Sequence, residues 1–163
     1  MRPVARGSWP SLELPVLSVA AIQGRVYAAG AMLALAHDLR VMRADRGWFC
    51  LPEVELGIVF TPAMARLLSA RLCPQVCHEA ILTGRRYGGR EAHQARIVDV
   101  VATAQALRPA VLELARERGC KPRAAVTAMR SVLYRDVIEA LRRRALQLSR
   151  RLPPHWRPRP RRR

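Results

Sequence analysis

Short apolar runs separated by turn residues dominate the first sixty residues of the chain. The run at 15–22 is bounded by a proline and by Gln-Gly, which predicts a buried strand. Residues 28–37 are apolar on nearly every side, which predicts a buried helix. Two further strands are expected in "LRVMRAD" and "WFCLPEV", on either side of a turn at 45–47.

The second half has apolar residues mainly at helical spacing. Thr61 and Pro62 suit the N-cap and the first position of a helix. A second helix is expected from Pro74 to a C-cap at Gly84. The other predicted elements are a short helix in "GREAHQAR", a strand in "IVDVVA", a helix at 103–118 closed by Gly119, and a helix from Pro122 through Leu148. Alternating strands and helices imply an α/β fold with a layered sheet and a helical C-terminal region.

Composition divides the chain into three parts. Residues 1–12 form an N-terminal extension without the apolar core of a signal peptide, and 13–148 form the folded domain. Residues 149–163 are predicted to be a disordered tail rich in arginine and proline. No stretch is long and apolar enough to span a membrane. The four cysteines fit no dense disulfide framework, so we expect reduced thiols in an intracellular protein.

The net charge of +17 is concentrated at the C-terminal end. Ten arginines and no acidic residue lie between Arg142 and Arg163. Lys121 is the sole lysine among 29 basic residues, a bias more typical of codon usage than of designed recognition. A basic nucleic-acid-binding protein is therefore an alternative that we do not favour, since no recognition motif accompanies the charge.

Four blocks resemble the enoyl-CoA hydratase/isomerase (crotonase) family in order and spacing. They are "PVLSVAAIQG", "GRVYAAGAMLALAHDLRVM", "RGWFCLPEVELGI" and "ILTGRRYGGREAHQARIVDVV". The resemblance covers roughly residues 13–142 and is greatest to plant enoyl-CoA delta isomerases. It implies a crotonase-like fold in which the first half of the usual domain is missing.

The resemblance also implies a role for the small residues at 28–31. In this family, backbone N–H groups at the start of this helix hold a thioester carbonyl, which places the oxyanion hole at Ala29, with Gly30 beside it. A helix N-terminus offers free N–H donors to an oxygen on which negative charge develops. Close helix–strand packing without a ligand is the alternative reading of the small residues.

Glu53, four residues before Gly57, matches the position of the family's catalytic glutamate. An apolar pocket would raise the pKa of its carboxyl, which suits a general base that later returns the proton. Glu55 is the rival, and in a strand both side chains would point to the same face. A solvated carboxylate at a strand end is the alternative for Glu53.

The position of the hydratases' second glutamate is Met32, which neither accepts a proton nor orients water. We therefore expect a delta(3)-delta(2)-enoyl-CoA isomerase of fatty-acid β-oxidation acting on an acyl-CoA thioester, or an inactive acyl-CoA-binding remnant. No cofactor beyond the coenzyme A of the substrate and no metal are expected, although Cys73, Cys77 and His78 lie close in sequence. Arg85, Arg86 and Arg90 could meet CoA phosphates or form a solvated basic face.

The resemblance further implies a homotrimer and a peroxisomal location. The chain ends in Arg-Arg-Arg and not in the Ser-Lys-Leu signal of many plant members, so a cytoplasmic location is the alternative.

Overall fold

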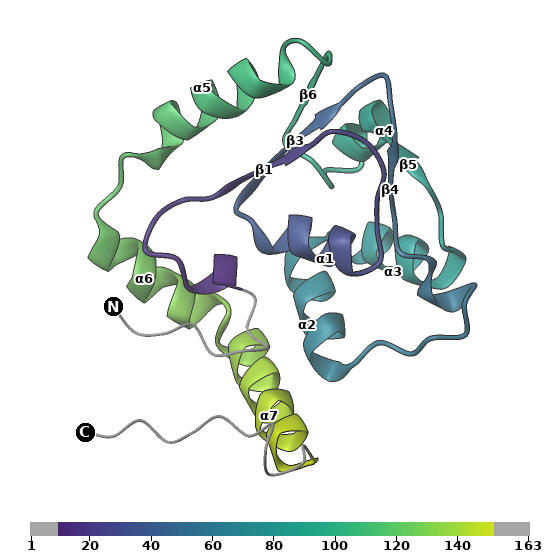
Figure 1. The fold of residues 1–163 in the computed structure, drawn as a ribbon, viewed down its shortest axis with the longest axis vertical. Coiled ribbons are helices and arrows are strands. Elements are labelled where there is room, and N and C mark those ends of the chain that lie inside the picture. Colours follow the sequence, from purple (N-terminus) through teal and green to yellow (C-terminus); the bar gives the residue numbers. More distant parts are fainter. Residues whose placement is uncertain (1–9, 152–163) are drawn as a thin grey trace.

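The computed structural model describes residues 10–151, which form helices around two small sheets (Figure 1). The elements are η1 (Pro10–Glu13), β1 (Val19–Ile22), β2 (Val26–Tyr27), α1 (Ala29–Ala36), β3 (Leu39–Arg43), β4 (Trp48–Cys50), η2 (Pro52–Val54), α2 (Pro62–Arg71), α3 (Pro74–Thr83), β5 (Tyr87–Gly88), α4 (Gly89–Gln94), β6 (Val100–Ala102), α5 (Leu107–Gly119), α6 (Arg123–Leu133) and α7 (Arg135–Arg151).

Each sheet has three strands. The first has the order β1–β3–β6 and is parallel throughout, with Val41 of β3 between Ala21 and Val100. The second has the order β2–β4–β5, in which β2 and β4 are parallel and β5 is antiparallel to β4. Helix α5 packs along the first sheet, as Figure 1 shows.

The core lies between the sheets and the helices α1, α2 and α3. Its fully buried members include Met32, Leu35, Met42, Phe49, Leu67, Leu68 and Tyr87. Helix α7 lies against α2. Helix α6 connects α5 to α7 at the edge of the molecule (Figure 1). No helix in the described part of the chain is both long and apolar enough to cross a membrane.

The predicted helix starts and stops around α2 and α3 are confirmed. The Thr61 hydroxyl accepts a hydrogen bond from the Met64 N–H at 3.4 Å, and Pro62 opens α2. Gly84 follows α3 with φ 62°, the left-handed conformation that favours glycine. The helix expected at 28–37 is also present, as α1, and is buried on one side only, because Leu33 is 48% exposed.

Two predicted elements are wrong in length. The strand in "WFCLPEV" ends at Cys50, because Pro52 opens the 3₁₀ turn η2 and has no N–H for a sheet. The helix expected from Pro122 through Leu148 is two helices that meet at Tyr134, whose φ of −109° and ψ of 20° break the helical path. The buried Tyr134 accepts a hydrogen bond from Arg71 of α2 at 2.7 Å, so tertiary packing fixes this bend.

Other boundaries shift by a few residues. Strand β6 begins at Val100 and helix α5 at Leu107, while the two-residue strands β2 and β5 were not predicted. Leu12, assigned to the N-terminal extension, is 2% exposed and belongs to the core. Helix α7 runs past 148 to Arg151, and the rest of the predicted tail lies outside the described residues.

Two arginines, Arg71 and the buried Arg40, hold the C-terminal end of α1. Arg71 donates hydrogen bonds to the backbone carbonyls of Leu35, His37 and Asp38 at 2.8, 2.7 and 2.8 Å. Arg40 donates to the His37 carbonyl at 3.0 Å. A helix leaves its last carbonyls without partners, and these guanidinium groups supply the donors.

The carboxylate of Asp38 ties three further segments to this point. It accepts hydrogen bonds from the Ser18 N–H and hydroxyl at 2.6 and 2.8 Å, just before β1. It also forms an ion pair with Arg130 of α6, whose side chain is 7% exposed and also donates to the Leu14 carbonyl. Asp38 therefore joins α1 and the start of β1 to the C-terminal helices.

We predict that Asp38→Ala lowers the free energy of unfolding by about 3 kcal/mol, because it leaves the buried Arg130 guanidinium without its counter-charge. Chemical denaturation measures the change. The control is Glu139→Ala, which removes a 3.9 Å ion pair with Arg143 on the exposed side of α7. It should cost about 0.5 kcal/mol or less. Equal losses in the two variants would contradict a structural role for the Asp38 network.

Candidate active site

The chain passes from β2 into α1 through a strained residue. Ala28 has φ 50° and ψ −127°, a conformation that non-glycine residues rarely adopt. Its N–H donates to the Cys50 carbonyl at 3.1 Å, so the start of α1 is fixed to the end of β4. Strain of this kind persists only where the surrounding structure imposes it, and it is frequent at functional sites.

The first turn of α1 leaves backbone N–H groups without partners. The first hydrogen bond of the helix runs from the Met32 N–H to the Ala28 carbonyl at 3.1 Å, so the N–H groups of Ala29 and Gly30 have no acceptor within the helix. Ala28 provides no side-chain cap, and both Ala29 and Gly30 are exposed. These donors can therefore bind an anionic oxygen from outside.

Packing alone does not require the glycine at position 30. A Cβ there would meet only Val26 Cγ2, at 3.6 Å, which is an ordinary contact. Close helix–strand packing therefore does not require a glycine at this position.

Glu53 lies in η2 and is 5% exposed. Its Oε2 is buried and has no hydrogen-bond partner among the described residues. Burial raises the pKa of the Glu53 carboxyl above the usual value, although a hydrogen bond from its own backbone acts in the opposite direction. A solvated strand-end carboxylate, the alternative from sequence, does not describe this side chain.

Glu55 does not share the face of Glu53. The prediction that both point the same way assumed a strand, but η2 is a 3₁₀ turn, in which residues two apart diverge. Glu55 is exposed, and its carboxyl lies against Gly84 at the end of α3. The burial of Glu53 therefore distinguishes it from its rival.

The two parts of the candidate site follow neighbouring strand ends. Strands β2 and β4 are parallel, with Tyr27 opposite Cys50. Ala29 comes two residues after Tyr27, and Glu53 three residues after Cys50. The carboxyl ends of parallel strands lie at the same edge of a sheet, where α/β proteins bind ligands.

Several other residues noted in the sequence have structural surroundings. Met32 is 1% exposed and part of the core, so it offers neither an acid nor a base at the surface. Arg85 is paired with Glu79 and Glu91 at 2.8 and 3.3 Å, which leaves it little free charge for a phosphate. Arg90 is exposed.

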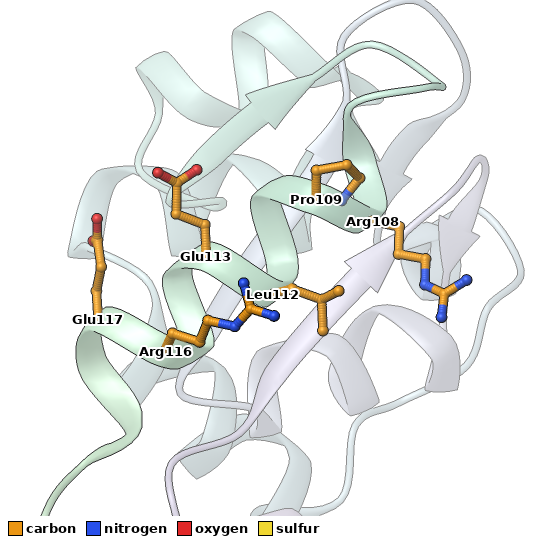
Figure 2. Close-up of a pocket in the computed structure, with 6 residues that line it drawn as sticks. All are labelled: Arg108, Pro109, Leu112, Glu113, Arg116 and Glu117. Carbon is orange, nitrogen blue, oxygen red and sulfur yellow. The ribbon is translucent and has the colours of Figure 1, made fainter.

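Cys73 is exposed and Cys77 is buried. Among residues 10–151, no group of three or more His, Cys, Asp or Glu side chains is arranged to hold a metal ion. Figure 2 shows a hollow along the outer side of α5, where Glu113 and Glu117 point away from Arg108. All of its lining residues come from this one helix, so no second element encloses a ligand there.

Sequence reasoning missed the contact that positions the site. The Ala28 N–H bond to Cys50 depends on the pairing of β2 with β4, and β2 is only two residues long. A strand this short has no periodicity that could be recognised. The small residues at 28–31 were the available sign that the backbone is used.

The structure is an α/β protein with two small sheets, in which a buried carboxyl and helix-start amides follow the carboxyl ends of neighbouring parallel strands. The model of the enoyl-CoA hydratase/isomerase family matches residues 9–153, and the chain belongs to this family.

Two groups of curated proteins are similar. The peroxisomal enoyl-CoA delta isomerase 2 of Arabidopsis thaliana is 37% identical over 92 residues, which cover 56% of this chain and 38% of that protein. The carnitinyl-CoA dehydratase of Citrobacter koseri is 36% identical over 128 residues, covering 78% of this chain and 48% of that protein. The chain thus spans less than half the length of these relatives.

Solved structures confirm the crotonase-like fold. A crystal structure of an enoyl-CoA hydratase from Mycobacterium marinum superposes with a TM-score of 0.78 at 23% identity, covering 91% of this chain and 65% of that chain. An enoyl-CoA hydratase subunit from Geobacillus kaustophilus gives a TM-score of 0.64 at 26% identity, covering 86% of this chain and 57% of that chain.

The raised pKa of Glu53 predicts a pH-dependent stability. Burial favours the protonated carboxyl of Glu53. The contribution of this protonated group to the free energy of unfolding is therefore full below the ordinary pKa of 4.5, and it is lost as pH rises through the folded-state pKa. Glu53→Gln keeps a neutral side chain. From acidic to neutral pH, the unfolding free energy of this variant should rise relative to that of the original chain. The rise should be about 1.4 kcal/mol for each unit by which folding raises the pKa of Glu53.

Denaturation at acidic and neutral pH measures this gain. Glu55→Gln is the matched control, because its carboxyl is exposed and its substitution should change stability little at either pH. A Glu53→Gln effect that is the same at both pH values would show that the carboxyl is not destabilised by burial.

Proposed function

We propose that this chain provides the acid–base site of an enoyl-CoA delta isomerase, which moves a β,γ double bond of an acyl-CoA into conjugation with the thioester. The single observation that carries the proposal is the buried Glu53 carboxyl with an unpartnered oxygen and a raised pKa. A buried carboxyl with a raised pKa can take up a proton and give it back.

In the proposed reaction, Glu53 removes a proton from the α carbon. The electron pair of that C–H bond enters the conjugated system, and negative charge develops on the thioester oxygen. The N–H groups of Ala29 and Gly30 donate to this oxygen. Protonated Glu53 then returns the proton to the γ carbon, so the double bond moves by one position and atoms are conserved.

The donors support the proposal because they are fixed before the substrate binds. Ala28 is held by Cys50 at 3.1 Å, so the first turn of α1 needs no rearrangement to present its N–H groups. A preorganised donor stabilises developing charge without a reorganisation cost, and losing one typically lowers the rate about a hundredfold or more.

Dehydration is the second candidate, since the similarity to the carnitinyl-CoA dehydratase covers 78% of the chain. A dehydratase also removes an α proton, but it must protonate a leaving hydroxyl as well. Met32 is apolar and 1% exposed, so the position that holds a second glutamate in the hydratases offers no acid here. This favours isomerisation, in which one carboxyl handles the single proton.

The coenzyme A of the substrate is the proposed carrier, and we propose no other cofactor. A homotrimer and a peroxisomal location remain predictions from the family resemblance. The word "peroxisomal" belongs to the name of the Arabidopsis thaliana relative.

We predict that the chain converts a β,γ-enoyl-CoA to the conjugated isomer and that Glu53→Gln lowers kcat/KM by about a hundredfold or more. The absorbance of the conjugated thioester follows the reaction. Glu55→Gln, the matched control, should keep kcat/KM within about threefold, because Glu55 lies outside the proposed proton path.

Three results would count against the proposal. The same rate in Glu53→Gln would exclude this carboxyl as the base. Faster water loss from a β-hydroxyacyl-CoA than double-bond migration would favour the dehydratase. Binding of acyl-CoA without turnover would identify an inactive acyl-CoA-binding protein.

A further inference from the structure

The outer face of the β2–β4–β5 sheet is basic and aromatic. In the observed register, Val26 pairs with Phe49 and Phe49 with Tyr87, and Phe49 and Tyr87 are buried in the core. Because side chains alternate along a strand, the residues next to them face the other way. Those that reach the surface are Arg25, Tyr27, Trp48 and Arg86, here named the outer sheet face, whereas Cys50 on the same side is 2% exposed.

Trp48 is the centre of this face. The guanidinium carbons of Arg25 and Arg86 lie 4.4 and 5.2 Å from the centroid of its ring. These stacked contacts keep both arginines on the sheet and direct their charge along it. Tyr27, from the neighbouring strand, is 59% exposed, so its ring is open to solvent.

The charge of the outer sheet face is not neutralised. Among the described residues, no carboxylate forms an ion pair with Arg25, Arg86 or the neighbouring Arg46. Asp45 is already committed to Arg43, at 3.0 and 2.7 Å. The guanidinium groups beside the exposed ring of Tyr27 are therefore available to bind an anion.

A hollow of about 550 Å³ adjoins the face, lined by Arg25, Arg43, Arg46 and Trp48 among others. It is bordered by the turns at Gly24 and Gly47, whose backbones are in close contact. A Cβ at Gly47 would lie 2.1 Å from the Gly24 carbonyl carbon, and Gly47 has φ 86°. This close contact fixes the two turns relative to each other, and with them the backbone positions of Arg25 and Arg46.

We propose that the outer sheet face binds single-stranded nucleic acid, with bases stacking on Tyr27 and phosphates bound by Arg25, Arg86 and Arg46. Exposed aromatic rings and arginines on an open sheet are the combination that holds unpaired bases. Guanidinium groups bind phosphate oxygens in pairs. A duplex hides the faces of its bases, so it loses the stacking contribution.

Arg25 and Trp48 lie at the ends of their strands away from the proposed acid–base site, whereas Tyr27 lies at the near end, two residues before Ala29. Arg25 precedes β2 and Trp48 opens β4, whereas Ala29 and Glu53 follow the opposite ends of these strands. Binding of nucleic acid to the outer sheet face requires no step of the isomerase reaction.

The test is fluorescence anisotropy of the full chain with a labelled oligouridine of about 12 nucleotides, titrated at several salt concentrations. Arg25→Gln with Arg86→Gln should weaken binding about tenfold at about 50 mM salt and lower the slope of log K against log salt by about 1.4. Tyr27→Leu should weaken binding about fivefold or more without changing the slope.

The control separates this face from the general charge of the chain and from its arginine-rich C-terminal sequence. Arg116→Gln with Arg118→Gln removes the same charge from exposed positions on α5 and should leave the affinity within about twofold. Of the substituted residues only Tyr27 lies within a strand, and all are exposed, so the fold should survive.

The proposal is overturned if the two double variants weaken binding equally, because the charge is then recognised without regard to place. It is also overturned if Tyr27→Leu has no effect, or if a duplex of the same length binds as tightly as the single strand. No detectable binding of oligouridine or of the matching oligothymidine would overturn it as well.

Discussion

The C-terminal end of α1 is the point on which the rest of the structure depends. The last residues of this apolar helix are buried, so their carbonyls are removed from water and must find donors in the protein. Arg71 from α2 and Arg40 from β3 supply them. Asp38, directly after the helix, brings Arg130 of α6 to the same place. Guanidinium groups from three parts of the chain thus converge on one helix end.

This convergence has a consequence at the other end of α1. With its C-terminus held by arginines and its N-terminus held by the hydrogen bond from Ala28 to Cys50, the helix has little freedom to shift. Its free N–H groups at Ala29 and Gly30 are therefore fixed relative to β4 and to η2, which carries Glu53. A helix of eight residues is short, and it is the tertiary contacts that make it a rigid support.

The sequence predicted those parts whose cause is local. The Thr61-Pro62 start of α2 and the Gly84 end of α3 follow from cap chemistry, and both are present. The bend at Tyr134 could not be predicted, because its cause is a hydrogen bond from Arg71, 63 positions away in the chain.

The candidate site shows the same division. Glu53 and the small residues before α1 could be selected from sequence, because their residue types and spacing are distinctive. The burial of Glu53 and the exposure of Glu55 depend on Pro52, which ends β4 and opens a 3₁₀ turn. Treating this stretch as a strand put both carboxylates on one face, which the structure corrects.

Strand β4 shows how few residues connect these features. Phe49 is fully buried and belongs to the core. The carbonyl of Cys50 fixes the start of α1, and its thiol donates to the Gly84 carbonyl at 3.2 Å, at the end of α3. Trp48 points to the opposite side, where Arg25 stacks on its ring. Because alternate residues of a strand face opposite ways, three residues suffice to anchor the core, the helix-start amides and the basic outer face at once. Neither surface can therefore move independently of the core that separates them.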